Sequence, residues 1–266
     1  MKIERYIPPP THPLHPYVQS VFYASFWVSR ELILPKCNVD ILFNFGDPIF
    51  IEKTPRVAGP DVWRKTLVAG LQTGAVVSRP KGAVTILGIS LHAATCRAVI
   101  PLPLSELSDS AIDGALLFPD IDLVWERLAS ESSFQHRCFR VLHWLMASLN
   151  PPSQAALIYR ACSLLEGYPD GRRIDEIVQA SSVSSRHLRR LFREYVGVGP
   201  AQYLRLSRFI KALDLMEAPL SLTEIAHEAL YCDQAHFCRD FKEIAGVSPT
   251  QYRIEAGPAT GHVFYT

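Results

Sequence analysis

Residues 187–203 read HLRRLFREYVGVGPAQY, and the pattern returns 49 residues later as HFCRDFKEIAGVSPTQY, residues 236–252. Nine of the 17 aligned positions are identical. Upstream, residues 176–178 match residues 224–226 at an offset of 48, so the second copy has one additional residue, Cys232, in its turn. Each copy predicts a short helix, a turn and a second helix that ends at a Gly-Val-x-Pro signal. Two such units in tandem are typical of helix-turn-helix proteins that read two neighbouring stretches of DNA.

The second helix of each copy is predicted to be amphipathic. Ser184 and Asp233 are suitable N-caps, and the apolar residues that follow them fall at i, i+3 and i+4, which makes one buried stripe. The opposite face carries residue types that contact phosphates or base edges in a major groove. We expect the DNA-binding residues on this face to be Ser185, Arg186, Arg189, Arg190 and Arg193 in the first copy and Gln234, Ala235, His236, Arg239 and Lys242 in the second.

An ordinary solvated helix surface is the alternative interpretation of these charged faces. Four arginines this close on one helix repel one another by roughly 0.2–0.5 kcal/mol per pair, which favours a helix that meets something anionic. Repetition at a fixed spacing also argues against a purely solubilising role. Ala235 has no polar group, so its direct readout is limited to an apolar contact, for instance with a thymine methyl.

Residues from about 156 to 256 resemble the DNA-binding domain of the AraC/XylS family of bacterial transcription regulators. The segment from Ala229 to Arg253, with its HFCRDFKEIAGVSPTQYR, carries the resemblance most specifically. The resemblance implies two helix-turn-helix subdomains joined by a long linking helix, which matches Pro200 to Met216 here. This chain departs from the family in the two turns, which commonly hold a glycine where it has Ser182 and Leu230. Because a leucine does not easily adopt a positive φ, the second turn is either of another type or strained.

The expected linking helix has recognisable ends. Pro200 suits the first helical position, and Glu217-Ala218-Pro219 ends the helix. About 16 residues at 1.5 Å each give a rod of roughly 24 Å. Such a rod can hold two recognition helices near the ~34 Å separation of successive major grooves. The run from Ser221 to Glu224 then predicts a capping box that opens the next helix.

Charge is strongly segregated along the C-terminal part, although the net charge of the chain is only +1. Residues 172–211 contain nine Lys/Arg and three Asp/Glu, a net charge of +6, whereas residues 212–256 contain three and eight, a net charge of −5. Phosphate neutralisation dominates non-specific affinity for DNA. We therefore expect the first subdomain and the linking helix to anchor the complex, and the second subdomain to bind more weakly or only at good sequence.

The first 150 residues have a β-rich pattern. Runs of β-branched and aromatic residues predict strands, and residues 120–149 turn helical. The fold class expected is an α+β N-terminal domain, β-rich with C-terminal helices, and an all-α C-terminal domain of two helix-turn-helix subdomains joined by a long linking helix. The strands are expected at 17–28, 39–45, 66–69, 75–78 and 84–91, and the domains at 1–150, a linker at 151–155, 156–256 and a tail at 257–266.

Residues 34–48, LPKCNVDILFNFGDP, weakly resemble the β-rich sensor or dimerisation domains that precede many AraC-type domains, with Trp27 ahead of a strand that contains Asp40. That resemblance implies a small-molecule pocket or a dimer face. Trp27, Phe43 and Phe45 are interpreted as core residues. His92 and Cys96 have the i, i+4 spacing of two metal ligands on one helical turn, but no second cluster completes a site, so we expect no metal.

The function expected is that of a sequence-specific transcription regulator, acting in the cytoplasm on double-stranded DNA. RNA polymerase, a small-molecule effector and a second copy of the chain are further candidate partners, and a ligand-independent dimeric regulator is the alternative. A repair-enzyme fusion is disfavoured, because such proteins need several zinc-binding cysteines ahead of the AraC-type domain and the first 95 residues contain only one cysteine, Cys37. The sequence also has no phosphate loop, nucleophile elbow or HExxH motif. We expect no enzymatic activity, no cofactor, no membrane partner and reduced cysteines.

Overall fold

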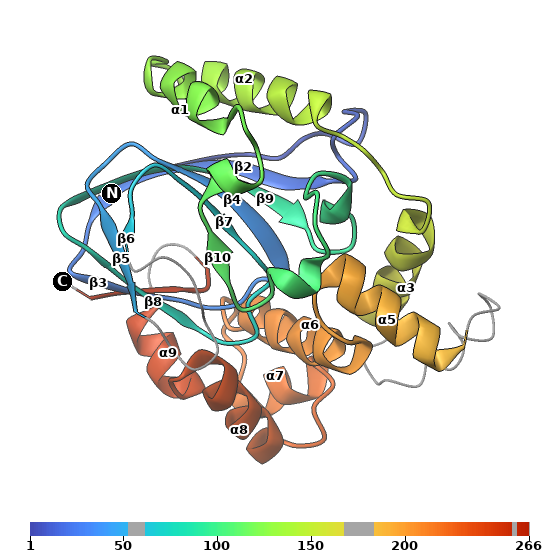
Figure 1. Cartoon of the computed structure of the whole chain (residues 1–266). Helices are drawn as coiled ribbons and strands as arrows, with labels where there is room; N and C mark the ends of the chain where they lie inside the picture. Colours follow the sequence, from blue (N-terminus) through green and yellow to red (C-terminus); the bar gives the residue numbers. More distant parts are fainter. Residues whose placement is uncertain (53–61, 168–183, 257–259, 266) are drawn as a thin grey trace.

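A computed structural model describes residues 1–52, 62–167, 184–256 and 260–265. Figure 1 shows a β-rich part, built mainly from the first half of the chain, and a helical part built from its C-terminal third. This layout confirms the fold class that the sequence predicts.

The described strands form two antiparallel sheets. The first sheet has the order β1-β2-β9-β4-β7-β10, and the second has the order β11-β3-β8-β5-β6. The strands are β1 Lys2–Tyr6, β2 Val18–Trp27, β3 Arg30–Ile33, β4 Asn38–Asn44, β5 Ile49–Glu52, β6 Val62–Trp63, β7 Thr66–Ala69, β8 Val76–Pro80, β9 Ala83–His92, β10 Ala111–Ile112 and β11 His262–Tyr265.

The described α-helices follow β10 in the chain and precede β11. Two of them, α1 and α2, lie over one face of the first sheet, and the others form the helical part (Figure 1). Short 3-10 segments at Cys96–Ala98, Leu104–Glu106 and Gly114–Leu116 connect β9 to α1. The α-helices are α1 Ile121–Ala129, α2 Phe134–Ala147, α3 Ala155–Gly167, α5 Ser185–Val196, α6 Pro200–Leu215, α7 Leu222–Glu228, α8 Gln234–Ala245 and α9 Pro249–Glu255.

The central strand β4 explains the core of the β-rich part. Ile41 and Phe43 alternate with more exposed residues and are fully buried, as expected for a strand with one face on the core. Ile41 lies opposite Ile89 of β9 and Val68 of β7. Trp144 of α2 meets Phe43 edge-on with ring centroids 6.2 Å apart, so the helix closes the core over the sheet.

Two sequence interpretations in this part are wrong. Trp27 is not a core residue, since its side chain is 74% exposed. It is the last residue of β2, opposite Ala83, beyond the buried stretch of the strand. His92 and Cys96 do not share a helical turn, because His92 ends β9 and Cys96 begins a 3-10 segment. Within the described ranges, no group of three or more His, Cys, Asp or Glu side chains is placed to hold a metal ion.

The expected helix boundaries of the C-terminal part are confirmed where the structure describes them. The linking helix is α6, with Met216 as its C-cap. Ser184 accepts a hydrogen bond from the His187 amide and Asp233 accepts one from the His236 amide, so both are N-caps. Ser221 and Glu224 form the expected capping box. These caps satisfy backbone amides that would otherwise lack a partner at the helix start.

The two turns have different outcomes. Ser182 and the first helix of the first copy lie outside the described residues. Leu230, in the second copy, has a φ of +60°, so of the two alternatives for this turn the strained one holds. Its side chain is 44% exposed, which means that no tight packing offsets the strain.

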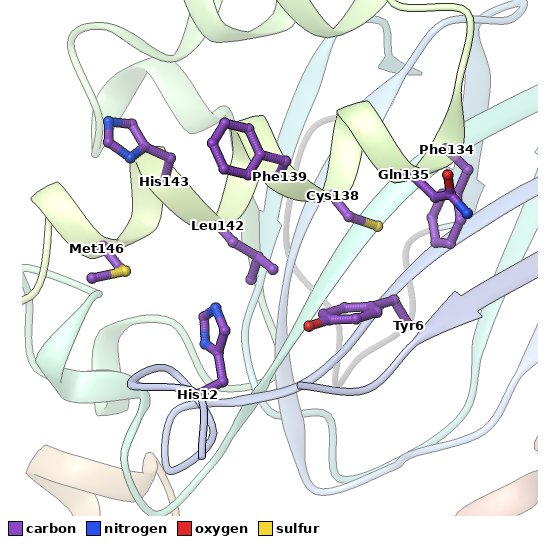
Figure 2. A pocket seen from close by; sticks show the side chains of 9 residues that line it. All are labelled: Tyr6, His12, Phe134, Gln135, Cys138, Phe139, Leu142, His143 and Met146. Atoms are coloured by element: carbon purple, nitrogen blue, oxygen red, sulfur yellow. The ribbon is translucent and has the colours of Figure 1, made fainter. Parts of the chain in front are cut away.

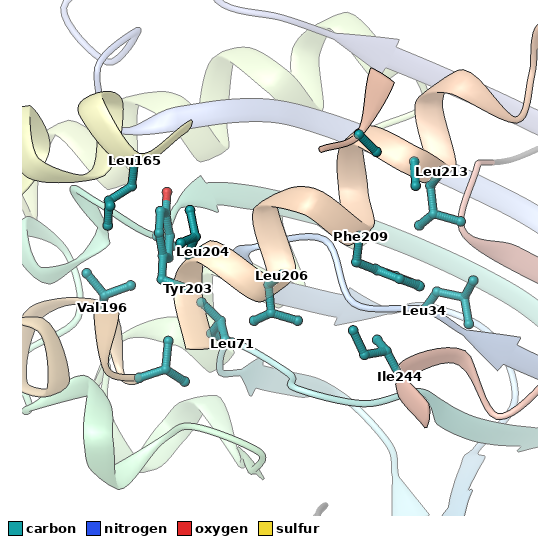
Figure 3. Close-up of a cluster of buried hydrophobic side chains, with 14 of the residues drawn as sticks. Leu34, Leu71, Leu165, Val196, Tyr203, Leu204, Leu206, Phe209, Leu213 and Ile244 are labelled. Atoms are coloured by element: carbon teal, nitrogen blue, oxygen red, sulfur yellow. The ribbon is translucent and has the colours of Figure 1, made fainter. Parts of the chain in front are cut away.

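The β-rich and helical parts share one continuous hydrophobic core. Leu34 and Leu71 of the β-rich part lie in the same buried cluster as Phe209 of α6 and Ile244 of α8 (Figure 3). The chain also returns to the β-rich part at its C-terminus, where residues assigned only as a tail form β11 and pair with β3. In the part of the chain that is described, no helix is long and apolar enough to cross a membrane.

Candidate nucleic-acid interface

Helix α5 separates an apolar side from a basic side. Leu188, Leu191 and Phe192 are buried. Ser185 is half-buried, and the four arginines expected on the outer side are all exposed: Arg186, Arg189, Arg190 and Arg193. Arg190 pairs with Glu194 at 2.9 Å and keeps 61% of its side chain exposed. An ion pair this exposed contributes little to stability, so Arg190 can exchange this partner for another anion.

Helix α8 repeats the arrangement with fewer charges. Phe237 and Phe241 are fully buried, while Gln234, Ala235, Arg239 and Lys242 are exposed. His236 is half-buried and meets the Tyr231 ring edge-on at 5.2 Å between centroids. The Gln234 amide oxygen accepts a hydrogen bond of 2.7 Å from the Thr223 hydroxyl. The outer side of α8 therefore carries the residue types for base contacts, with two cations instead of four.

A buried polar network behind α8 is the feature that sequence reasoning missed. The Asp240 carboxylate is 8% exposed and accepts hydrogen bonds from Arg205 Nε at 2.6 Å and from the Tyr231 hydroxyl at 2.9 Å. Arg205 of α6 also pairs with Glu243 at 2.8 Å. The matched position in the first copy is the buried Leu191. The signal was available in the repeat, because an acidic residue stands where the other copy has a core leucine.

The ionisation of this network follows from its partners. Burial acts to lower the pKa of Arg205, but the hydrogen bonds to Asp240 and Glu243 outweigh it and raise that pKa. Burial, and then the nearby charge of Asp240, raises the pKa of Tyr231. Arg205 therefore stays charged and Tyr231 stays a hydrogen-bond donor at neutral pH, which fits a carboxylate between them.

The linking helix holds both of these helices by aromatic contacts. Tyr203, near its start, meets Phe192 of α5 with ring centroids 6.0 Å apart. Phe209, further along, meets Phe241 of α8 at 5.1 Å. The Tyr203 hydroxyl also donates a hydrogen bond to Glu166 of α3. Because the basic sides of α5 and α8 point away from these contacts, α6 positions the two helices without using their outer residues.

A groove on the β-rich part lies between α2 and the N-terminal segment that includes β1 (Figure 2). It encloses about 300 Å³. Tyr6 and His12 line one side, opposite Phe139, Leu142 and other side chains of α2. Burial, with a smaller effect from Glu4, raises the pKa of its Cys138 thiol to about 12. The thiol is therefore protonated at neutral pH, and the groove suits an apolar occupant more than a redox or metal site.

Parts of the chain match known families and regulators. Residues 177–254 match a helix-turn-helix domain, and residues 6–113 match a domain of unknown function, DUF6597. The chain is 32% identical over 103 residues to the HTH-type transcriptional activator AarP of Providencia stuartii, which covers 38% of this chain and 76% of AarP. It is 39% identical over 82 residues to the F1 operon positive regulatory protein of Yersinia pestis, which covers 30% of this chain and 27% of that protein.

A solved structure of ToxT from Vibrio cholerae has a similar fold over most of the chain. Its TM-score is 0.53 at 10% identity, with 88% of this chain and 95% of that one covered. At this identity the likeness concerns the fold alone.

Tandem helix-turn-helix units behind a β-rich domain define a class of DNA-binding transcription regulator. The chain belongs to the AraC family of transcription regulators.

Proposed function

We propose that α5 and α8 enter successive major grooves of double-stranded DNA and read its sequence there. The observation that carries this proposal is the matched geometry of the two helices. Each packs its apolar side on α6 and leaves its outer side exposed, with Arg190 and Arg239 at equivalent repeat positions. The 16 residues of α6 span roughly 24 Å. That length suits two helices attached near its ends and aimed at grooves about 34 Å apart.

The DNA-binding residues in this proposal are the ten that the sequence predicts, with unequal roles in the two units. Ser185, Arg186, Arg189, Arg190 and Arg193 form the electropositive side, which favours phosphate contacts and binding to any sequence. The residues of the second unit lie within a segment, residues 212–256, whose net charge is −5: Gln234, Ala235, His236, Arg239 and Lys242. The second unit is therefore proposed to contribute mainly at a specific site.

A footprint of the full chain tests this function. Duplexes that bind are first selected from a random library with the full chain, and the protected bases are then mapped. Two protected major-groove segments about 10–10.5 base pairs apart are expected. One protected segment would contradict the proposal that both helices read DNA.

We further propose that residues 1–150 regulate the binding carried out by residues 156–256, with residues 151–155 as linker, through a small-molecule effector or through self-association. Support for an effector comes from the groove beside α2, which is at the lower end of the volume of about 300–1,000 Å³ usual for ligand sites. A ToxT structure of similar fold is described as bound to an unsaturated fatty acid, so long-chain carboxylic acids are the first compounds to test. The melting temperature of the full chain should rise with the degree of saturation if one of these acids binds.

Support for self-association comes from exposed apolar side chains on the helices of this domain. Phe139 of α2 is 72% exposed, and large exposed apolar groups favour contacts with a partner. Sedimentation of the full chain should show a dimer that Phe139→Ser weakens. Leu123→Ser on α1, where the side chain is 49% exposed, is the matched control. Equal sedimentation of the wild type and Phe139→Ser would contradict this route.

We propose that the regulator acts in the cytoplasm, where bacterial DNA lies, and that RNA polymerase is a further partner at its promoters. The proposal includes no enzymatic step, in keeping with relatives that are transcription regulators.

A further inference from the structure

Two loops of the β-rich part are joined by hydrogen bonds and lie against the helical part. We call these loops, residues 70–75 and residues 104–110, the platform. Asp109 connects them, because its carboxylate accepts hydrogen bonds from the Thr73 amide at 2.6 Å and from the Thr73 hydroxyl at 2.7 Å. The Asp109 amide in turn donates to the Leu71 carbonyl at 3.0 Å. The φ of Asp109 is +50°, a conformation that Asp tolerates better than most residues.

The platform contacts the first helix-turn-helix unit at the end of α5. Gly197 caps this helix with a φ of +98°. A Cβ at this position would lie 2.1 Å from the Ser108 hydroxyl and 3.0 Å from the Leu104 carbonyl oxygen. The Leu71 side chain lies in the same buried cluster as Val196, the last residue of α5 (Figure 3). The platform therefore supports the end of α5 both by backbone contact and by packing.

The same platform contacts the second unit at the equivalent place. The Ala75 amide donates a hydrogen bond of 2.9 Å to the carbonyl of Ile244, in the last turn of α8. Carbonyls in the last turn of a helix have no partner within the helix, so the platform supplies one. Each candidate recognition helix is thus held at its C-terminal end, while the exposed residues proposed to contact DNA are left free on its outer side.

We propose that the platform sets the spacing and relative orientation of α5 and α8, and thereby makes the protein selective for the distance between its two half-sites. A single linking helix joins the two units by one path, whereas the platform adds a second path and closes a ring. One inserted base pair moves a half-site by about 3.4 Å along the DNA and rotates it by about a tenth of a turn. A closed ring resists that displacement. This inference rests on the proposal that both helices read DNA.

The repeat supplies a matched pair of variants. Gly197→Asn places a Cβ 2.1 Å from the Ser108 hydroxyl and 3.0 Å from the Leu104 carbonyl oxygen, so Ser108, Leu104 or the end of α5 must shift and the contact with the platform is loosened. Gly246→Asn changes the equivalent residue of the second unit, where φ is +75° and a Cβ would meet no atom within 4 Å. Asn accepts positive φ more readily than other residues with a side chain, so the two variants share the cap strain and differ in the platform contact.

The full chain is titrated with two duplexes: one has the selected spacing between half-sites, and the other has one base pair added between them. The measured quantity is the dissociation constant for the second duplex divided by that for the first. Wild type and Gly246→Asn should both show a ratio of about tenfold or more, the loss expected when base contacts are displaced. Gly197→Asn should show a ratio below threefold. A wild-type ratio for folded Gly197→Asn, or an equally low ratio for Gly246→Asn, would overturn the role of the platform.

A second pair tests the joint within the platform. Asp109→Gly keeps the backbone conformation but loses both bonds to Thr73, and should lower the ratio as Gly197→Asn does. Asp109→Asn retains an acceptor and a donor for Thr73 and should restore the wild-type ratio. If Gly197→Asn does not fold, this pair decides alone by the same criterion. If the footprint of the wild-type protein covers only one half-site, the proposal that both helices read DNA is wrong. If the wild-type footprint covers both half-sites but the variants keep the wild-type ratio, only the role of the platform is wrong.

Discussion

Replacing Asp240 by leucine would convert the second unit to the arrangement of the first, in which Leu191 occupies the matched position. The variant removes the acceptor shared by Arg205 and the Tyr231 hydroxyl. Among the described residues, Arg205, whose side chain is 23% exposed, then keeps its ion pair with Glu243, which is 54% exposed. We expect Asp240→Leu to lower the stability of the folded protein and to loosen the attachment of α8 to the linking helix.

The size of the loss follows from how deeply the network is buried. Removing one partner of a buried ion pair costs about 3–5 kcal/mol, because the other charge is left buried without compensation. The remaining contact with Glu243 and the partial exposure of Arg205 place this variant at about 2–3 kcal/mol. The double variant Arg205→Leu/Asp240→Leu removes both charges and leaves mainly the Tyr231 hydroxyl unsatisfied, a loss of about 1–3 kcal/mol.

Urea unfolding of the wild type, both single variants and the double variant gives the coupling between Arg205 and Asp240. The double variant should be at least as stable as Asp240→Leu, with a coupling energy of about 1–2 kcal/mol. Additive losses, within about 0.5 kcal/mol, would show that the network does not act as a unit. A loss below about 0.5 kcal/mol for Asp240→Leu would refute the premise that the carboxylate is held in a buried ionic contact.

Four further variants test other parts of the molecule. Arg190→Ala should weaken binding to selected and random duplexes alike and reduce the slope of log affinity against log salt concentration by about one unit. Arg239→Ala should reduce the binding free energy by roughly 1–3 kcal/mol on the selected duplex only. Equal losses of affinity for random DNA in the two variants would contradict this division. Leu230→Gly should raise the free energy of unfolding by about 1 kcal/mol, because glycine adopts positive φ without strain; a decrease would show that the leucine side chain contributes more than the strain takes away. Burial, and then the charge of Lys36, lowers the pKa of His262 below 6.5. The folded state therefore favours neutral His262, and the free energy of unfolding should fall as the pH drops through 6.5. His262→Gln should make the free energy of unfolding depend less on pH in this range, and an unchanged pH profile would exclude His262 as the source of the dependence.

The strands that the sequence predicts are those with a sustained pattern of β-branched and aromatic residues. Residues 66–69 are predicted and observed as β7 with the same limits, and residues 84–91 lie within β9. Strands such as β3 and β11 are four residues long and lack a pattern that distinguishes them from loops. β11 is a strand because it pairs with β3, and β3 pairs with both β11 and β8; a local pattern does not contain these partners.

The contacts between the β-rich part and the helical part could not be predicted from sequence patterns either. The repeat predicts that Gly197 and Gly246 end their helices, and both do so with positive φ. Nothing in either motif tells them apart. Only the structure shows that a Cβ on Gly197 would meet the platform and one on Gly246 would not, because that difference depends on where the loops of a distant domain lie.

The two copies of the repeat share some buried residues and differ in others. Phe192 and Phe241 are identical and fully buried, and each packs its ring against an aromatic residue of α6. Leu191 and Asp240 differ, and with them the attachment differs: both units have apolar contacts with α6, and the second unit adds a charged network with defined directions. Hydrogen bonds restrict orientation more than apolar contacts do. The unit with fewer outward cations is thus the one whose attachment includes directional hydrogen bonds, which suits the role proposed for α8 as a helix that selects bases more than phosphates.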